Sequence, residues 1–298
     1  METQSLHIPV LVDEVIELLD LQPGEIAIDA TVGDGGHAEK ILEHIIPGGF
    51  LLGLDRDPEA VAFAYEKLSL HQPKNQFAIH HGSYLDLDDI LKSYGYRGAD
   101  AILFDLGLSS RELAGGRGFS FQTDAPLDMR FDPESELTAE TIVNSWPKDK
   151  IADLLWSSGE ERASRRIADA IFRARQKGRI TTTAALADLV SQAKGGRTGK
   201  IHPATQTFQA LRIAVNDELG ALTITLPKAI ALLNPGGRLA VISYHSLEDR
   251  IVKQQFRSLS QQKQVNLITK KPLGATRPEI LKNPRARSAK LRVIEKIN

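Results

Sequence analysis

A glycine-rich turn near the start of the chain has residue types and a spacing that could bind a ligand. It follows a short apolar stretch at residues 26–28 and reads Gly33-x-Gly35-x-x-Ala38. A helix is expected to begin within this turn, so free backbone N–H groups and the positive end of a helix dipole would lie at the C-terminal edge of a strand. Open α/β sheets bind nucleotides at that edge, and the spacing fits the alanine variant of the dinucleotide-binding fingerprint.

Acidic residues around the turn decide which ligand fits. Asp29 ends the first apolar stretch, Asp34 lies in the turn, and Asp55 ends the next apolar stretch, residues 50–55. A pyrophosphate would face the first two charges at close range, which is costly in a partly dry cleft. A ligand with a sulfonium and an ammonium group, such as S-adenosylmethionine, would be attracted. Asp55 follows the glycines by roughly 20 residues, the usual distance for a carboxylate that holds ribose hydroxyls. The alternative is that the glycines only form a turn.

Another acid ends the fourth apolar stretch. Residues 100–105 are predicted to form a strand that ends in Asp105, and residues 106–110 form a loop. In a doubly wound sheet this loop lies across the switch point from the glycine turn, so Asp105 and Ser109 should approach whatever reacts with the cofactor. The alternative for Asp105 is a helix cap or a turn former. Tyr84 follows the third predicted strand and could pack either near an adenine or in the core.

Composition excludes several function classes. The 298-residue chain has 42% apolar and 25% charged residues, as ordinary soluble proteins have, and it has no cysteine. Disulfides, thiolate zinc sites and cysteine nucleophiles are therefore absent. The eight histidines do not fall at ligand spacings, so no metal site is predicted. No apolar run reaches the roughly 20 residues of a membrane span, so we expect a cytoplasmic protein without a membrane partner.

The alternation of strands and helices is interrupted once. Strands are expected at residues 26–28, 50–55, 77–80, 100–105, 238–243, 265–269 and 291–295, the last two as an antiparallel hairpin. From about residue 112 to residue 216 the sequence shows no convincing buried strand. Helices are expected there instead, at residues 139–145, 148–156, 160–175, 182–192 and 206–216. The predicted fold is therefore α/β, a Rossmann-like seven-stranded sheet of the class I S-adenosylmethionine-dependent methyltransferases. Its domain would comprise residues 1–111 and 217–298, and residues 112–216 would form an inserted helical domain that recognises the substrate.

The positive charge is unevenly distributed. Residues 250–298 contain 13 Lys or Arg and two acids, a net charge of +11, although the whole chain carries −1. A second basic group lies in the predicted helix at 160–175 and beyond, where the basic residues are Arg162, Arg165, Arg166, Arg173, Arg175, Lys177, Arg179, Lys194, Arg197 and Lys200. Such groups are often only solvated surface, but their place beside a predicted active site favours a polyanionic partner.

Nine segments resemble one family along nearly the whole chain, the bacterial small-subunit ribosomal RNA methyltransferase H family, also called MraW. They are Asp34-Gly-Gly-His37, Asp105-Leu-Gly-Leu-Ser-Ser110, Arg117-Gly-Phe-Ser-Phe121, Pro126-Leu-Asp-Met-Arg130, Gly159-Glu-Glu-Arg162, His202-Pro-Ala-Thr205, Phe208-Gln-Ala-Leu-Arg-Ile213, Ser243-Tyr-His-Ser-Leu-Glu-Asp-Arg250 and Asn283-Pro-Arg-Ala-Arg-Ser-Ala-Lys-Leu-Arg292. The resemblance implies methyl transfer from S-adenosylmethionine to N4 of a cytidine in the decoding region of 16S rRNA. It implies 16S rRNA, within the small ribosomal subunit, as partner, and it leaves a homodimer open.

The resemblance also assigns residues to the cofactor. The family's cofactor positions fall on Gly35, Gly36, His37, Asp55, Tyr84 and Asp105, and on Glu112 where the family usually has glutamine. An amide can donate a hydrogen bond and a carboxylate cannot, so Glu112 departs from the family pattern. The family often has phenylalanine where this chain has Tyr84 and Tyr244.

The absence of cysteine agrees with methylation of an exocyclic amine, because methylation of cytosine C5 normally needs a cysteine nucleophile. We expect Asp105, with nearby backbone carbonyls or Ser109, to accept hydrogen bonds from the amine, so Asp105 and Ser109 are the candidate catalytic residues. Other functions stay open at this point. They are an NAD-dependent oxidoreductase, a small-molecule or protein methyltransferase, a methyltransferase for another RNA site, and a non-catalytic RNA-binding assembly factor.

Overall fold

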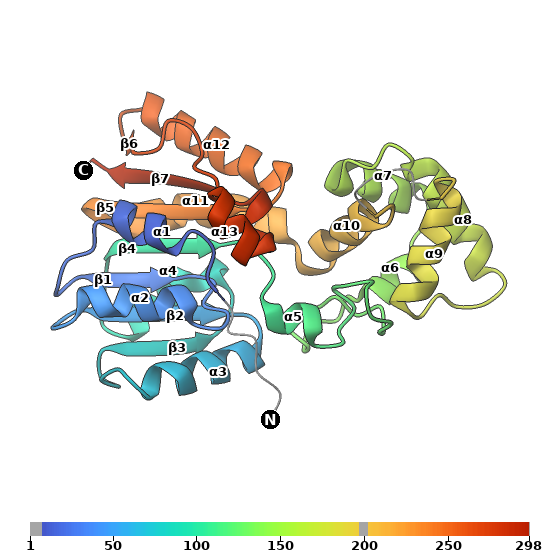
Figure 1. Ribbon diagram of the computed structural model, residues 1–298. Coiled ribbons are helices and arrows are strands. Elements are labelled where there is room, and N and C mark those ends of the chain that lie inside the picture. The colour runs from blue at the N-terminus through green and yellow to red at the C-terminus, as the bar shows by residue number, and fades with distance from the viewer. Residues whose placement is uncertain (1–7, 197–201, 298) are drawn as a thin grey trace. The chain divides into compact units, whose positions relative to one another are not determined.

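The computed structural model describes residues 8–196 and 202–297. The chain forms two compact units, one of residues Met1–Ser109 with Leu219–Asn298 and one of residues Ser110–Glu218. Figure 1 labels the elements of both units. Two of the basic residues noted in the sequence, Arg197 and Lys200, lie outside the described residues.

The first unit is built on a seven-stranded sheet with the order β3-β2-β1-β4-β5-β7-β6 (Figure 1). The strands are β1 (Ile26–Asp29), β2 (Phe50–Asp55), β3 (Phe77–His81), β4 (Ala99–Asp105), β5 (Leu233–Ser243), β6 (Val265–Leu267) and β7 (Lys290–Lys296). The first five strands are parallel, and β7 is antiparallel to both β5 and β6. This confirms the predicted seven-stranded α/β sheet and its antiparallel end. Since β1 and β4 are neighbours, the chain reverses its direction of winding between them.

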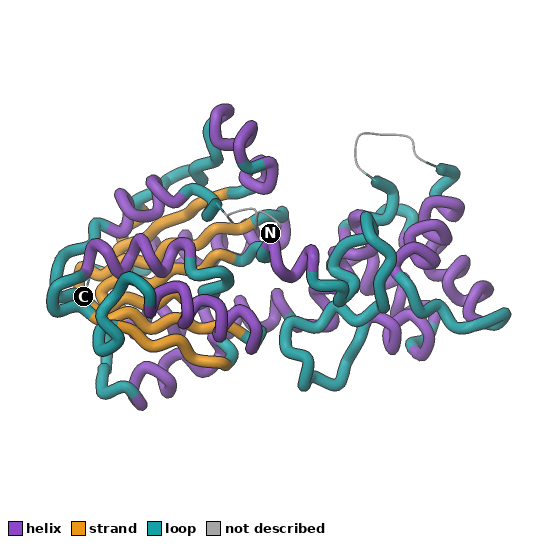
Figure 2. The backbone as a smooth tube through the Cα atoms, turned by 60° about the horizontal axis from the view of Figure 1, so that its bottom comes forward, coloured by secondary structure: helices purple, strands orange, loops and turns teal. Residues whose placement is uncertain are grey.

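Alternating side chains of the central strands explain why helices cover both faces of the sheet. In β4, Ala101 and Leu103 belong to one buried cluster, while Ile102 and Phe104 belong to the other. The first cluster includes residues of α1 (Val12–Leu19), α2 (Gly36–Ile45) and α3 (Pro58–Ser69), and the second includes residues of α4 (Leu87–Ser93), α11 (Glu218–Leu232) and α12 (Ser246–Gln261). Figure 2 shows helices on both sides of the strands. Strands buried on both faces read as continuous apolar runs, which is why they were predictable.

Some elements of this unit differ from the expectation. The short helix α13 (Arg277–Lys282) and the 3-10 helices η1 (Tyr84–Asp86) and η2 (Pro284–Ser288) were not predicted. Strand β5 begins at Leu233 rather than Arg238, because Leu233 already pairs with Ala99 of β4. The turn residues 234–237 then lie within an irregularity of the pairing, since the next pair joins Arg238 to Ala101.

The second unit consists of helices and loops (Figure 2). Its helices are α5 (Ser110–Ala114), α6 (Ala139–Ser145), α7 (Lys148–Gly159), α8 (Ser164–Arg175), α9 (Thr183–Ala193) and α10 (Thr205–Asn216). Among its described residues no strand is assigned, and the only β-bridge is the isolated pair Pro126 and Thr182. The helix α5 was not predicted. The proposed role of this region in substrate recognition stays a prediction.

The predicted start of the helix at residue 160 is wrong. Helix α7 continues to Gly159, and Glu160 caps it in the left-handed conformation with a φ of 50°. A left-handed residue ends a helix, so α8 begins only at Ser164. Arg175, counted in the sequence among the basic residues of this region, donates to the carbonyls of Val143 and Trp146 at 3.0 and 2.7 Å, so it also has a structural role.

Two of the family-like segments hold the loops of this unit together. Arg117 donates to the carbonyl of Phe131 at 2.9 Å, and the ring of Phe119 stacks on that of Phe131 with centroids 5.3 Å apart. The side-chain amide of Asn216, at the end of α10, donates to the Met129 carbonyl and accepts from the Phe131 N–H, both at 2.8 Å. These segments therefore have structural roles. Among the described residues, no helix is both long and apolar enough to cross a membrane.

Candidate functional site

The glycine turn links β1 to α2 at the C-terminal edge of the parallel strands. Gly33 and Gly35 have φ values of 49° and 71°, in the left-handed region that favours glycine. Gly35 is the N-cap of α2, so no side chain caps that helix end. A Cβ atom on Gly36 would lie 3.2 Å from the ring of Pro9. The turn thus presents backbone N–H groups at the start of α2, as the sequence predicted, and the N-terminal segment packs closely beside it.

Asp55 is tied to this turn from the end of β2. Its carboxylate accepts hydrogen bonds from the N–H of Gly33 at 2.8 Å and from the N–H of Asp57 at 2.9 Å. Burial raises the pKa of Asp55 to about 6, against the effect of these hydrogen bonds. Each carboxylate oxygen has a second lone pair, so Asp55 keeps acceptor capacity for ribose hydroxyls. The structure therefore places Asp55 directly beside the predicted cofactor turn.

Asp29, at the end of β1, is almost fully buried, with 1% of the residue exposed. Burial raises its pKa to about 7, and the negative charges of Asp105 and Asp55 act in the same direction, while a hydrogen bond from the Thr31 N–H opposes them. Three carboxylates thus lie at the ends of the neighbouring strands β2, β1 and β4. Their crowding destabilises the negative charge and favours a cation at this edge.

Asp105 is held from both sides at the end of β4. Its backbone N–H donates to Thr31 Oγ1 at 2.7 Å, and its Oδ1 accepts a hydrogen bond of 2.8 Å from the hydroxyl of Tyr244. Burial and the charge of Asp105 raise the pKa of Tyr244 well above its usual value of 10. The phenol therefore stays protonated and continues to donate to the carboxylate. Asp105 is fixed in orientation and still has unoccupied lone pairs.

His37 faces the same carboxylate from α2. Its Nε2 lies 2.9 Å from the carbonyl oxygen of Val10, and its Nδ1 lies 3.6 Å from Asp105 Oδ2. A carbonyl can only accept, so Nε2 must carry the proton. His37 thereby links the segment before α1 to the acidic edge of the sheet.

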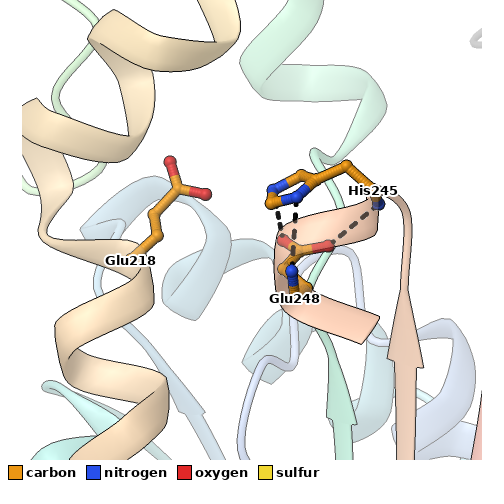
Figure 3. Close-up of side chains that lie close together, drawn as sticks. All are labelled: Glu218, His245 and Glu248. Carbon is orange, nitrogen blue, oxygen red and sulfur yellow. Dashed lines mark hydrogen bonds and ion pairs between the residues drawn. The ribbon is translucent and has the colours of Figure 1, made fainter. Parts of the chain in front are cut away.

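The start of α12 positions Tyr244. Glu248 accepts hydrogen bonds from the backbone N–H groups of Tyr244 and His245 at 2.8 and 3.2 Å. The ring of His245 accepts from the Glu248 N–H and completes a capping box, which Figure 3 shows. A Cβ atom on Gly107 would lie 2.6 Å from the Tyr244 ring, so the glycine after β4 allows the ring to reach Asp105. The segments around residues 105 and 244 are therefore fitted to each other.

For the remaining predicted site residues, the structure gives their location and burial, and their roles stay predictions. The ring of Tyr84, in η1, meets Phe104 edge to face with centroids 5.4 Å apart and is half-buried, so contact with an adenine stays a prediction. Ser109 is half-buried in the loop after β4. Glu112 is 9% exposed in α5 and belongs to the second unit. The roles of Ser109 and Glu112 likewise stay predictions.

Sequence reasoning did not identify Thr31, Tyr244 and Glu248 as parts of this site. Tyr244 could have been found, because it directly follows a parallel strand just as the three aspartates end theirs. Thr31 and Glu248 form hydrogen bonds with residues of other segments or with the backbone, and no local pattern marks such bonds.

Part of the basic C-terminal charge has a structural role. Asp249 of α12 lies 2.7 Å from Arg292 and 3.2 Å from Lys290. Burial alone would raise the pKa of Asp249, but the hydrogen bonds and charges of these two cations outweigh it and lower the pKa. Lys296 donates to the Ala231 carbonyl at 2.8 Å. The exposed cations of this region include Lys253, Arg257, Lys270, Lys271, Arg277, Lys282 and Arg287.

Comparisons with known proteins identify the family of this chain. A model of the MraW methylase family matches residues 4–297. Over alignments of 311, 309 and 317 residues, the chain is 48, 46 and 43% identical to proteins named ribosomal RNA small subunit methyltransferase H from Dehalococcoides mccartyi, Thermomicrobium roseum and Brevibacillus brevis. The alignments cover 99, 98 and 100% of this chain and 88, 94 and 100% of those proteins. A methylase family does not include nicotinamide-dependent oxidoreductases. The chain belongs to the MraW methylase family.

Proposed function

We propose that the protein transfers a methyl group from S-adenosylmethionine to N4 of a cytidine in the decoding region of 16S rRNA. The observation that carries this proposal is the fixed Asp105 carboxylate at the switch point of the sheet, near the glycine turn, the buried Asp29 and the half-buried Asp55. The relatives are named as small-subunit ribosomal RNA methyltransferases, which supports 16S rRNA as the substrate. The choice of N4 rests on the family resemblance and on the chemistry of the site.

The residues at the strand ends fit S-adenosylmethionine. Asp29 and Asp55 have raised pKa values because they are buried close to other negative charges, and a sulfonium and an ammonium group nearby would relieve that repulsion. Gly35 and Gly36 are the turn positions that we assign to the cofactor, Asp55 can hold the ribose, and Tyr84 offers a ring to the adenine. When bound, S-adenosylmethionine supplies an electrophilic methyl group.

Asp105 is suited to assist an amine. The lone pair of the cytosine N4 is delocalised into the ring, so the amine is a weak nucleophile. A carboxylate that accepts hydrogen bonds from the two N4–H groups increases the electron density on nitrogen and stabilises the positive charge that develops there. The Tyr244 hydroxyl occupies one lone pair of Oδ1 and keeps the carboxylate from rotating. The chain has no cysteine, so an attack of a thiolate on the cytosine ring plays no part.

Methyl transfer to 16S rRNA tests the proposal. Purified protein, S-adenosylmethionine labelled in the methyl group, and small subunits from cells that lack the enzyme are incubated together. Nuclease digestion and mass spectrometry then locate the label. We expect N4-methylcytidine at a single position in the decoding region. Label at another base, at C5 of cytosine or in protein would contradict the proposal.

Variants of Asp105 test the mechanism. Asp105→Ala removes the acceptor and should abolish most activity. Asp105→Asn keeps the shape and the hydrogen bond from Tyr244, but it has one acceptor oxygen and no charge, so its activity should also be low. Near-normal turnover of the alanine variant would refute the role of Asp105. Asp188→Asn, at an exposed position of α9, is the control for the loss of one acid.

A further inference from the structure

The second unit has a groove where the end of α7 meets the start of α8. It has a volume of about 730 Å³. Its lining combines one aromatic ring with several charged groups, and the side chains that matter here are Asp153, Trp156, Arg162, Arg165 and Arg166. All of them belong to residues 110–218, so the groove lies within one compact unit.

Trp156 is the aromatic side chain of the groove, and 61% of the residue is exposed. On the other side of α7, Ile151 and Leu155 are fully buried and pack the helix onto its neighbours. The indole is therefore not needed for the core. A large exposed ring with an apolar face is suited to stack on a flat partner.

The arginines of the groove point to an anionic partner. Arg162, Arg165 and Arg166 are exposed, and none of them has an ion-pair partner among the described residues. By contrast, Arg173 near the other end of α8 pairs with Asp169 at 2.6 Å. Among the described residues, the lining has three arginines and one acid, Asp153, so these side chains carry a net positive charge.

A buried ion pair holds the turn between the two helices. The carboxylate of Glu161, which is 2% exposed, lies 2.6 Å from Lys194 Nζ and also accepts from the Ala163 N–H at 2.8 Å. Gly159 lies so close to α10 that a Cβ atom would be 2.6 Å from the Gln206 carbonyl oxygen. The backbone that carries the arginines is thus fixed before any partner arrives, which lowers the entropy cost of binding.

We propose that this groove binds a single-stranded segment of the RNA substrate, with an unpaired base stacked on Trp156 and neighbouring phosphates against the arginines. The inference rests on the proposed function, because it takes the substrate to be RNA. Single-stranded RNA is recognised by stacking on aromatic rings together with positive charge along the backbone. In a duplex the bases are stacked on each other, so the indole would have no partner. An acidic protein segment could use the arginines but would not need the exposed ring.

Two variants with matched controls separate stacking from charge. Trp156→Ala should weaken binding of a short fluorescent oligouridine by about 5- to 150-fold, the range for one stacked base, and Trp156→Phe should restore most of the affinity. Arg165→Gln with Arg166→Gln should make the salt dependence of log Kd shallower by about 0.7 per lost phosphate contact. The control Lys74→Gln with Arg97→Gln removes the same charge from exposed positions outside the groove and should change the affinity far less.

Methyl transfer by the same proteins distinguishes this inference from the proposed function. We expect the groove variants to raise KM for 16S rRNA and to leave kcat almost unchanged. If the wild-type enzyme methylates 16S rRNA but the groove variants bind RNA like the control, the groove inference is overturned and the function stands. If the groove variants lose affinity only for assembled small subunits, and not for oligouridine or protein-free 16S rRNA, the groove contacts a ribosomal protein and the inference is also wrong. If the wild-type enzyme methylates no RNA, the proposed function fails.

Discussion

Asp29→Asn should stabilise the sheet at neutral pH. The residue Asp29 is 1% exposed, and burial raises the pKa of its carboxyl group from 3.8 to about 7 on folding. Between these two pH values the folded chain holds a proton that the unfolded chain has lost. The free energy of unfolding therefore falls as the pH rises through this range, and the loss is complete above the folded pKa. Asparagine keeps the shape and an oxygen that can accept from the Thr31 N–H, but it has no charge to bury.

The size of the effect follows from the pKa shift. Ionisation of Asp29 lowers the free energy of unfolding of the wild-type chain. At pH 5 only part of this decrease has occurred, and at pH 8 it is nearly complete. Integration between these pH values gives a difference of about 3 kcal/mol. The advantage of Asp29→Asn over the wild type should therefore grow by about this amount from pH 5 to pH 8. The neighbouring Asp55 is present in both proteins, so its contribution to the pH dependence of the free energy of unfolding largely cancels in the comparison.

The assay must report on the sheet rather than on the helical unit. Both tryptophans, Trp146 and Trp156, lie in the second unit, so tryptophan fluorescence in urea follows that unit. Native-state amide hydrogen exchange in β1 and β4 reports on the sheet. We expect slower exchange there in Asp29→Asn at pH 8, after correction for intrinsic exchange rates, and unchanged fluorescence transitions.

A second protein controls for net charge. Asp188→Asn removes one acid from an exposed position of α9 and should not reproduce the growing difference in the sheet. An advantage of Asp29→Asn that is equal at pH 5 and pH 8, or that shrinks as the pH rises, would refute the reasoning that a buried negative charge at this edge costs stability.

Three further outcomes are expected. S-adenosylmethionine should bind more tightly at pH 8 than at pH 6, because Asp29 and Asp55 ionise in this range, and calorimetry should show a smaller pH effect for S-adenosylhomocysteine, which lacks the sulfonium charge. Tyr244→Phe removes the 2.8 Å hydrogen bond to Asp105 and should lower kcat by about 10- to 150-fold, since such bonds to charged groups contribute ~1.5–3 kcal/mol. An unchanged kcat would contradict the positioning role. Glu112→Gln restores the family's amide and should lower the Kd of the cofactor in equilibrium dialysis, and a weaker affinity would show that the carboxylate is the better partner.

The sequence predicted the sheet well because its signals are local. Each central strand is a run of apolar residues, and Asp29, Asp55 and Asp105 end three of them. The topology of parallel sheets then brings those acids to one edge. The glycine turn was predictable for the same reason, since the positive φ of Gly33 and Gly35 requires the residue type that the sequence shows.

The missed features depend on contacts between distant parts of the chain. Tyr244 and Asp105 are 139 residues apart in the sequence, and no periodicity predicts their hydrogen bond. The start of α8 was misplaced because Glu160 takes a left-handed conformation that its residue type does not favour. The hydrogen bond from Arg175 to the carbonyl of Val143 in α6 was not predicted, because the position of a residue on its own helix does not show which other helix packs beside it.

The hydroxyl of Tyr244 explains how an acidic site can be both crowded and ordered. Asp105 lies near other carboxylates, so its charge alone would tend to push the side chain towards water. A donor that could itself ionise would add to the repulsion, but burial and the charge of Asp105 raise the pKa of Tyr244 so far that the phenol remains a donor at any physiological pH. Glu248 fixes the backbone of Tyr244, and Gly107 leaves room for its ring. A phenylalanine here would fill the same space but would leave Oδ1 of Asp105 without this hydrogen bond. In this chain the orientation of Asp105 therefore depends on a residue that comes from the far end of the sequence.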